Sequence, residues 1–185
     1  MRRTAVLLAL VLLGGGCATG AEPEPEPRGP IRAAEPQHAE LGWRETYPEA
    51  GSSKLVFEVD ELDVTTTGWS VRVAVTNGTA TPFDVETGPA EYSFGLMLFP
   101  TGDLEAVVEA NREGRLPPVR EATRVEPAPP PVLQPGVTWR ATLSAPGSLA
   151  DGSWVRVVFG TFLGRNEPPD ELRRVVWFTD RSHRL

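Results

Sequence analysis

The chain carries few of the side chains that perform nucleophilic or general-base chemistry. It has one cysteine, Cys17, one lysine, Lys54, and two histidines, His38 and His183. A serine or cysteine hydrolase needs a nucleophile, a base and an orienting group in contact, and neither histidine lies in a segment that would hold a base rigidly. The motifs Gly-x-Ser-x-Gly and Ser-x-x-Lys do not occur. We therefore expect no catalytic residue and no cofactor.

Acidic residues gather in two short segments that could supply oxygen ligands. They are Glu58, Asp60, Glu61 and Asp63, and then Glu167, Asp170 and Glu171. Calcium needs converging oxygens, and neither segment has EF-hand spacing. A solvated strand edge and a solvated loop are favoured over a metal site. A carboxylate pair of the glycosidase type stays open, because such pairs come from distant strands and the sequence selects none.

The sixteen residues before Cys17 have a pattern that indicates a role for this single thiol. Arg2 and Arg3 give a positive start, residues 5–13 are continuously apolar, and three glycines precede the cysteine. This is the three-part pattern of a secretory leader. The apolar run is shorter than the roughly 20 residues of a membrane-spanning helix.

The segment resembles the lipobox of bacterial lipoproteins over the first seventeen residues. Gly15 and Gly16 match the small positions directly before the cysteine, while Gly14 stands where that family usually has leucine. The resemblance implies cleavage after Gly16 and acylation of Cys17, which would become the first residue. Two or three acyl chains exceed the threshold for stable anchoring. The alternative is an ordinary leader cut near Ala18 or Gly20, with Cys17 discarded.

Net charge and the segment after Cys17 limit the partners. The formal charge is −7 and becomes more negative once Arg2 and Arg3 are removed, which argues against nucleic acid and against electrostatic binding to anionic lipid. Residues 21–30 contain three successive Glu-Pro pairs and a fourth proline, and such a segment forms an extended spacer. We assign residues 1–16 to the signal peptide, 17–53 to the anchor and a disordered tether, and 54–185 to one domain. Within the tether, Leu41, Trp43 and Tyr47 are expected to dock on that domain, and contact with a partner is the alternative.

The domain has the period-two pattern of β-strands. The clearest alternation runs from Trp69 to Thr76, and the phase slip in residues 55–64 predicts a bulge at Asp60–Glu61. Residues 83–85 are expected as an edge strand and 92–99 as a central strand. Residues 103–114 form the one helix candidate. About seven short strands with one short helix predict an all-β, antiparallel β-sandwich.

The valine-rich strand ending in Val75-Thr76-Asn77, and the turn Leu133-Gln134-Pro135-Gly136 that leads to Trp139, resemble the Ig-like modules of bacterial envelope lipoproteins. The resemblance covers residues 54–179 and implies an Ig-like sandwich, although the antibody-type Cys…Trp…Cys spacing is absent. Most tryptophans fall in predicted strands and are expected in the core. An exposed aromatic platform for sugar or peptide is the alternative, with Trp154 and Trp43 as its candidates. Asn77-Gly78-Thr79 matches a glycosylation acceptor but is better interpreted as a turn.

These observations predict a non-enzymatic lipoprotein, anchored through Cys17 in a cell membrane or outer membrane on the extracytoplasmic side. Its Ig-like domain is expected to be a binding or structural module for an envelope protein or glycan. A carboxylate-based envelope hydrolase is one alternative, which a buried pair of acids would favour. A protease-inhibitor-like sandwich is another, which a rigid exposed loop within residues 126–136 would favour.

Overall fold

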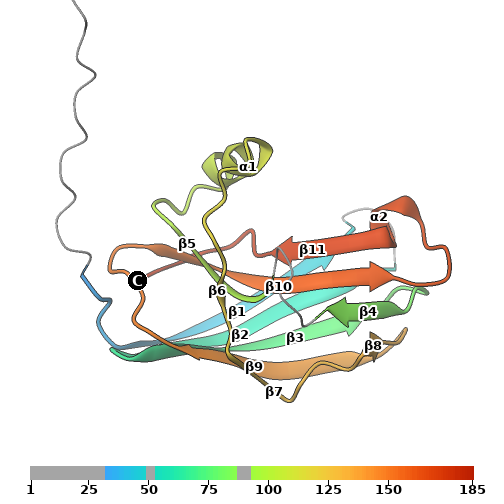
Figure 1. Cartoon of the computed structure of the whole chain (residues 1–185), viewed down its shortest axis with the longest axis horizontal. Coiled ribbons are helices and arrows are strands. Elements are labelled where there is room, and N and C mark those ends of the chain that lie inside the picture. Colours follow the sequence, from blue (N-terminus) through green and yellow to red (C-terminus); the bar gives the residue numbers. More distant parts are fainter. Residues whose placement is uncertain (1–31, 49–52, 87–92) are drawn as a thin grey trace, which may run out of the picture. The chain divides into compact units, whose positions relative to one another are not determined.

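The structure is a computed structural model, and it describes residues 32–48, 53–86 and 93–185. The leader, Cys17 and the Glu/Pro segment lie outside the described residues. Residues Ile31–Leu185 form one unit, which consists of two antiparallel sheets packed face to face (Figure 1). The predicted all-β sandwich with a short helix is confirmed.

The first sheet, called here the β3 sheet, has five strands in the order β1-β2-β3-β9-β7. Their bounds are Gln37–Tyr47 (β1), Leu55–Val64 (β2), Gly68–Asn77 (β3), Thr138–Pro146 (β9) and Arg124–Glu126 (β7). The register of β2 against β3 shifts between Val59 and Glu61, which confirms the predicted bulge.

The second sheet, called here the β10 sheet, is built around the long strand β10 (Trp154–Gly164). One side of β10 pairs with β5 (Phe94–Phe99) and β4 (Phe83–Glu86), and the other with β12 (His183–Arg184) and β11 (Arg174–Phe178). The strand β6 (Arg120–Glu121) pairs with β5, and β8 (Val132–Leu133) pairs with β4. The helices are α1 (Leu104–Arg112) and α2 (Asp170–Arg173). Because β4 has partners on both sides, its expected edge position is wrong.

Strand number and domain start differ from the sequence expectation. The described residues contain twelve strands instead of about seven, since β6, β8 and β12 are two-residue pairings that no local pattern marks. The sandwich begins before Lys54, because β1 pairs with β2 along nearly its whole length. The boundary placed between residues 53 and 54 therefore falls inside the sandwich, and Leu41, Trp43 and Tyr47 do pack against its core.

Apolar side chains from the facing surfaces of both sheets fill the space between them. Phe57 of β2 is at the centre, with its ring centroid 5.0 Å from that of Phe159 and 5.9 Å from that of Phe162. Trp177 of β11 stacks on Phe57 at 5.3 Å. Full burial of one such side chain contributes roughly 1.5–3 kcal/mol, so this cluster is a major source of stability.

The strand β10 changes the face it presents to the core at Gly160. Val155, Val157 and Phe159 point inward, and after Gly160 the inward residue is Phe162. Gly160 has φ +75°, and a Cβ there would lie 3.1 Å from the Phe94 ring. A β-bulge with glycine in this conformation changes which side chains of the strand face the core. It lies between the part of β10 that pairs with β5 and the part that pairs with β4.

Candidate functional site

The helix α1 is built by local signals that the sequence contains. Asp103 caps the helix, its Oδ1 accepting from the backbone N–H of Glu105 at 3.0 Å. Thr101 Oγ1 accepts from the N–H of Asp103 at 3.1 Å. At the other end Gly114 has φ +66°, and the N–H of Arg115 donates to the carbonyl of Ala110 at 2.8 Å. The predicted helix in residues 103–114 is confirmed.

Helix α1 covers the outer surface of the β10 sheet with very little buried area. Val107 is its one buried residue, and it packs on Met97, Phe99 and Val158. On another side of the helix, Leu104 is 38% exposed and Val108 is 40% exposed, one turn apart. A helix of this length is marginal on its own, so its position depends on one apolar contact and on its caps.

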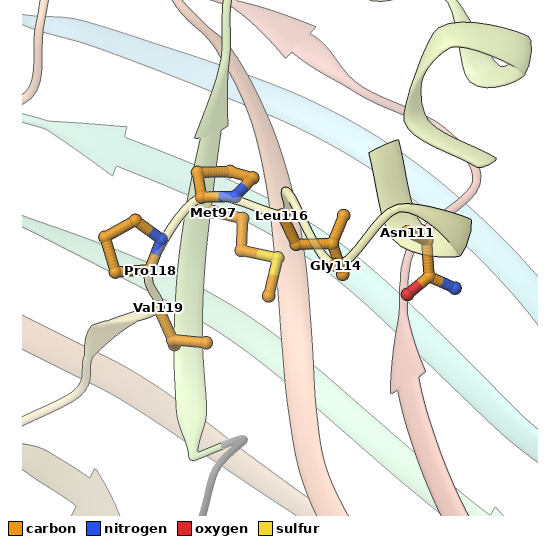
Figure 2. Close-up of a pocket in the computed structure, with 7 residues that line it drawn as sticks. Met97, Asn111, Gly114, Leu116, Pro118 and Val119 are labelled. Atoms are coloured by element: carbon orange, nitrogen blue, oxygen red, sulfur yellow. The ribbon is translucent and has the colours of Figure 1, made fainter. Parts of the chain in front are cut away.

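Two hollows flank this contact and share Pro117, and we call them together the α1 groove. The larger has a volume of about 460 Å³ and lies between Phe99–Thr101 and the helix residues Ala106 and Ala110. The smaller, of about 250 Å³, is lined by Met97 and by the loop after the helix. Figure 2 shows Met97 of β5 close to Leu116, Pro118 and Val119, with Asn111 at the opposite side.

The lining of the larger hollow is mostly apolar, with Glu109 and Arg115 as its charged residues. Both charges have close partners, since Arg112 lies 3.5 Å from Glu109 and Arg115 pairs with Glu113. Pockets of several hundred Å³ with apolar walls and few polar groups are typical of binding sites. The groove therefore offers apolar contact area and no reactive group.

The strongest polar centre in the described residues is Arg156 of β10, on the same outer surface. Its side chain is completely buried. The guanidinium donates to the carbonyls of Thr179 at 2.7 Å, Gly102 at 3.1 Å and Asp180, and it lies 5.6 Å from the Phe99 ring centroid. Burial lowers the pKa of Arg156 from its ordinary value, whereas the nearby acids oppose that shift. Arg156 holds the loop before α1 and the segment after β11 against β10.

Glu45 of β1 holds the same C-terminal segment from the other side. Its carboxylate accepts from Trp177 Nε1 at 3.0 Å and from the backbone N–H groups of Asp180 and Arg181 at 3.0 and 3.1 Å. These bonds join β1 of one sheet to β11 of the other. Hydrogen bonds to a charged group contribute more than neutral ones, so Glu45 closes this edge of the sandwich.

The acidic segments of the sequence are used largely in ion pairs. Glu58 pairs with Arg44, Glu61 with Arg72 at 2.7 Å, and Asp63 with His38 at 2.7 Å; Asp170 pairs with Arg173 at 2.9 Å. Among residues 32–48, 53–86 and 93–185, no group of His, Cys, Asp and Glu is arranged to hold a metal.

No aspartate or glutamate within the described ranges is buried. The buried pair of acids that would favour the hydrolase alternative is therefore not found in this part of the chain. Residues 126–136, the loop that would favour the protease-inhibitor alternative, do not project freely either. Trp139 Nε1 donates to the carbonyl of Pro127 at 3.2 Å, Asn77 Nδ2 donates to that of Leu133 at 3.0 Å, and the N–H of Gly136 donates to the carbonyl of Asn77 at 2.6 Å.

Burial decides two further expectations. Trp43 is 8% exposed and packs on the core as expected, while Trp154 is partly buried against the cluster below α1, so neither candidate forms an exposed aromatic platform. Asn77 is completely buried, and its amide bonds Thr79, Thr81 and Leu133. Its side chain is occupied in the turn, which agrees with the turn interpretation of Asn77-Gly78-Thr79.

The predicted lipidation residue, Cys17, lies outside the described residues. Neither helix in the described ranges has the length and apolar character needed to cross a bilayer. The sequence did not single out Arg156, Glu45 or the α1 groove. The one sequence signal for the groove was the helix pattern, which predicted Leu104, Val107 and Val108 on one face of the helix.

The described residues therefore form an all-β sandwich domain with a small groove beside helix α1. Comparison with protein-family models, with curated proteins and with solved structures gives no match.

Proposed function

We propose that this chain is a cell-envelope lipoprotein, anchored through acylated Cys17, that displays an Ig-like binding module on the extracytoplasmic side of a membrane. The anchor is supported by the leader and by the three glycines before the single cysteine. The binding role is supported by one observation above all, the α1 groove beside a helix that buries a single residue. The module has no enzymatic role in this proposal.

The chemistry of the groove favours a protein partner. Its larger hollow is walled by Phe99, Pro100, Ala106 and Val107, and Leu104 and Val108 add exposed apolar area nearby. A sugar needs hydrogen-bonding groups along its length, whereas an apolar peptide segment needs buried contact area. We therefore assign the groove to an extended apolar segment of another envelope protein.

The anchor is tested by phase partitioning. The wild-type protein is expected to enter the detergent phase and the Cys17→Ser variant to stay in the aqueous phase. Equal partitioning of both proteins, or mass spectrometry that finds the thiol unmodified, would contradict the anchor without affecting the groove.

The groove is tested by site-specific photocrosslinking in cells. A photoreactive residue at Ala110 is expected to give one discrete protein adduct, and one at Arg140, which is exposed on the β3 sheet, is expected not to. The captured protein is then purified and titrated against the wild type and Ala106→Glu. Binding should fall at least about tenfold in the variant, because the introduced carboxylate must be desolvated on binding. An unchanged affinity, with the variant folded by circular dichroism, contradicts the assignment.

A further inference from the structure

A row of polar residues crosses all five strands of the β3 sheet at one level. Cross-strand pairing brings together His38 of β1, Asp63 of β2, Ser70 of β3, Ser144 of β9 and Arg124 of β7. They belong to the outer surface, because the strand neighbours Val64, Trp69, Val71 and Leu143 are buried in the core. With strands about 4.8 Å apart, the row from Asp63 to Arg124 extends over roughly 14 Å.

A hollow opens over four members of this row. It has a volume of about 380 Å³ and is lined by Asp63, Ser70, Ser144 and Arg124, with Thr65 and Thr123 from the adjoining loops. The two threonine hydroxyls already donate to backbone carbonyls, that of Thr65 to Gly68 and that of Thr123 to Ser144, so toward a ligand they can act as acceptors. It lies on the opposite sheet from the α1 groove, and its walls combine apolar groups of Trp69, Ala145 and Pro146 with hydroxyls and one charge of each sign.

Hydroxyl groups in this row are free to bind a ligand. Ser70 and Ser144 are direct cross-strand partners, yet neither hydroxyl has a hydrogen-bond partner within the described part of the chain. Further along the same two strands, the equivalent pair Thr76 and Thr138 bond each other at 2.8 Å. The difference leaves two adjacent groups in the hollow, each able to donate and accept.

The two charged residues are each held in place by a neighbour, which makes the hollow close to neutral. His38 Nδ1 bonds one oxygen of Asp63, Oδ1, at 2.7 Å, and Arg124 Nε bonds Glu126 at 2.8 Å. The second oxygen of Asp63 stays able to accept, and the terminal nitrogens of Arg124 stay able to donate. An anionic ligand such as phosphate gains little from a site with balanced charge.

We propose that this row, together with Thr65 and Thr123, binds a short neutral oligosaccharide laid across the strands. Asp63 accepts from ring hydroxyls at one end, Arg124 donates at the other, and Ser70 and Ser144 exchange hydrogen bonds between them. This site is independent of the α1 groove and of the anchor.

The test is titration of the isotope-labelled protein with two probes, the β-1,4-linked trimer of N-acetylglucosamine and maltotriose, followed by NMR. At least one probe is expected to shift the amide signals of Thr65, Ser70, Thr123 and Ser144 and to leave those of Thr76 and Thr138 unchanged. The Ser70→Ala/Ser144→Ala double variant is expected to weaken binding about tenfold, because two hydrogen bonds are lost. Thr142→Ala, an exposed change on the same strand as Ser144, serves as the matched control and should bind like the wild type.

Three results would overturn the proposal. The first is the absence of shifts at these residues with both trimers. The second is equal affinity of the double variant and the wild type. The third is tighter binding of inorganic phosphate than of either sugar at this row, which would show that charge and not hydroxyl chemistry selects the ligand.

Discussion

Replacing Arg156 with methionine tests whether the buried guanidinium stabilises the fold. Methionine keeps most of the aliphatic volume over Phe99 but removes the donors to Thr179, Asp180 and Gly102. A hydrogen bond from a charged group contributes about 1.5–3 kcal/mol. The sum overstates the loss, because the wild type also carries the cost of desolvating the charge. Asp180 is exposed and Gly102 half-buried, so their carbonyls can regain water, whereas Thr179 is buried.

The net expectation is a loss of about 2–3 kcal/mol in the free energy of unfolding, mainly from the unpaired Thr179 carbonyl. That corresponds to a fall in Tm of roughly 4–12 °C for a chain of this size. Urea unfolding followed by tryptophan fluorescence measures it. The matched control is Arg72→Met, which removes an exposed ion pair with Glu61 and should cost less than about 1 kcal/mol. If Arg156→Met is as stable as the wild type, the cost of desolvating the charge cancels its hydrogen bonds and the reasoning is refuted.

Asn77→Ala should lower the free energy of unfolding by about 2–4 kcal/mol in urea, because it leaves several buried partners of the amide unpaired; a loss below 1 kcal/mol would mean that water replaces the amide. Gly160→Val should cost at least about 1–2 kcal/mol by thermal unfolding, since φ is +75° and a Cβ at this position would lie 3.1 Å from the Phe94 ring; an unchanged Tm would show that the bulge can be rebuilt. Burial lowers the pKa of His183 from 6.5, so its contribution to stability is complete above pH 6.5 and is lost as the pH falls. The bond to Asp63 raises the pKa of His38, so its contribution is complete below pH 6.5 and is lost as the pH rises. Urea unfolding from pH 5 to 8 should therefore show a smaller acid loss in His183→Gln and a smaller alkaline loss in His38→Gln, and opposite signs would contradict both assignments.

Strands that alternate between core and solvent were predictable from the sequence. In β3 the buried residues Trp69, Val71, Val73 and Val75 alternate with more polar ones, and the phase slip in β2 located a real bulge. Period-two burial is a local property, so a single strand displays it without knowledge of its neighbours. The same applies to the Asp103 cap of α1.

Features that depend on tertiary contacts were not predictable. β1 was predicted to be part of the tether. In the structure Gly42 has φ +57° and the register with β2 shifts between Glu40 and Trp43, so this strand lacks an unbroken period-two pattern. Arg156 lies on the outward face of β10, where a charge normally meets water, but the loop at Gly102 covers it. The α1 groove and the polar row are formed by segments that are far apart in the sequence. No local sequence pattern therefore predicts either of them.

The order of strands in the β3 sheet has a consequence for the order in which the domain folds. β1, β2 and β3 follow one another and pair as local hairpins, which form early because little loop entropy is lost. The next neighbour, β9, begins only at Thr138 and is separated from β3 in the sequence by β4, β5 and α1. Until β9 arrives, the free side of β3 presents unpaired backbone groups beside a row of valines, a surface prone to pairing with other chains. A folding intermediate in which β1, β2 and β3 are paired and β9 is not would therefore be the species most prone to aggregate.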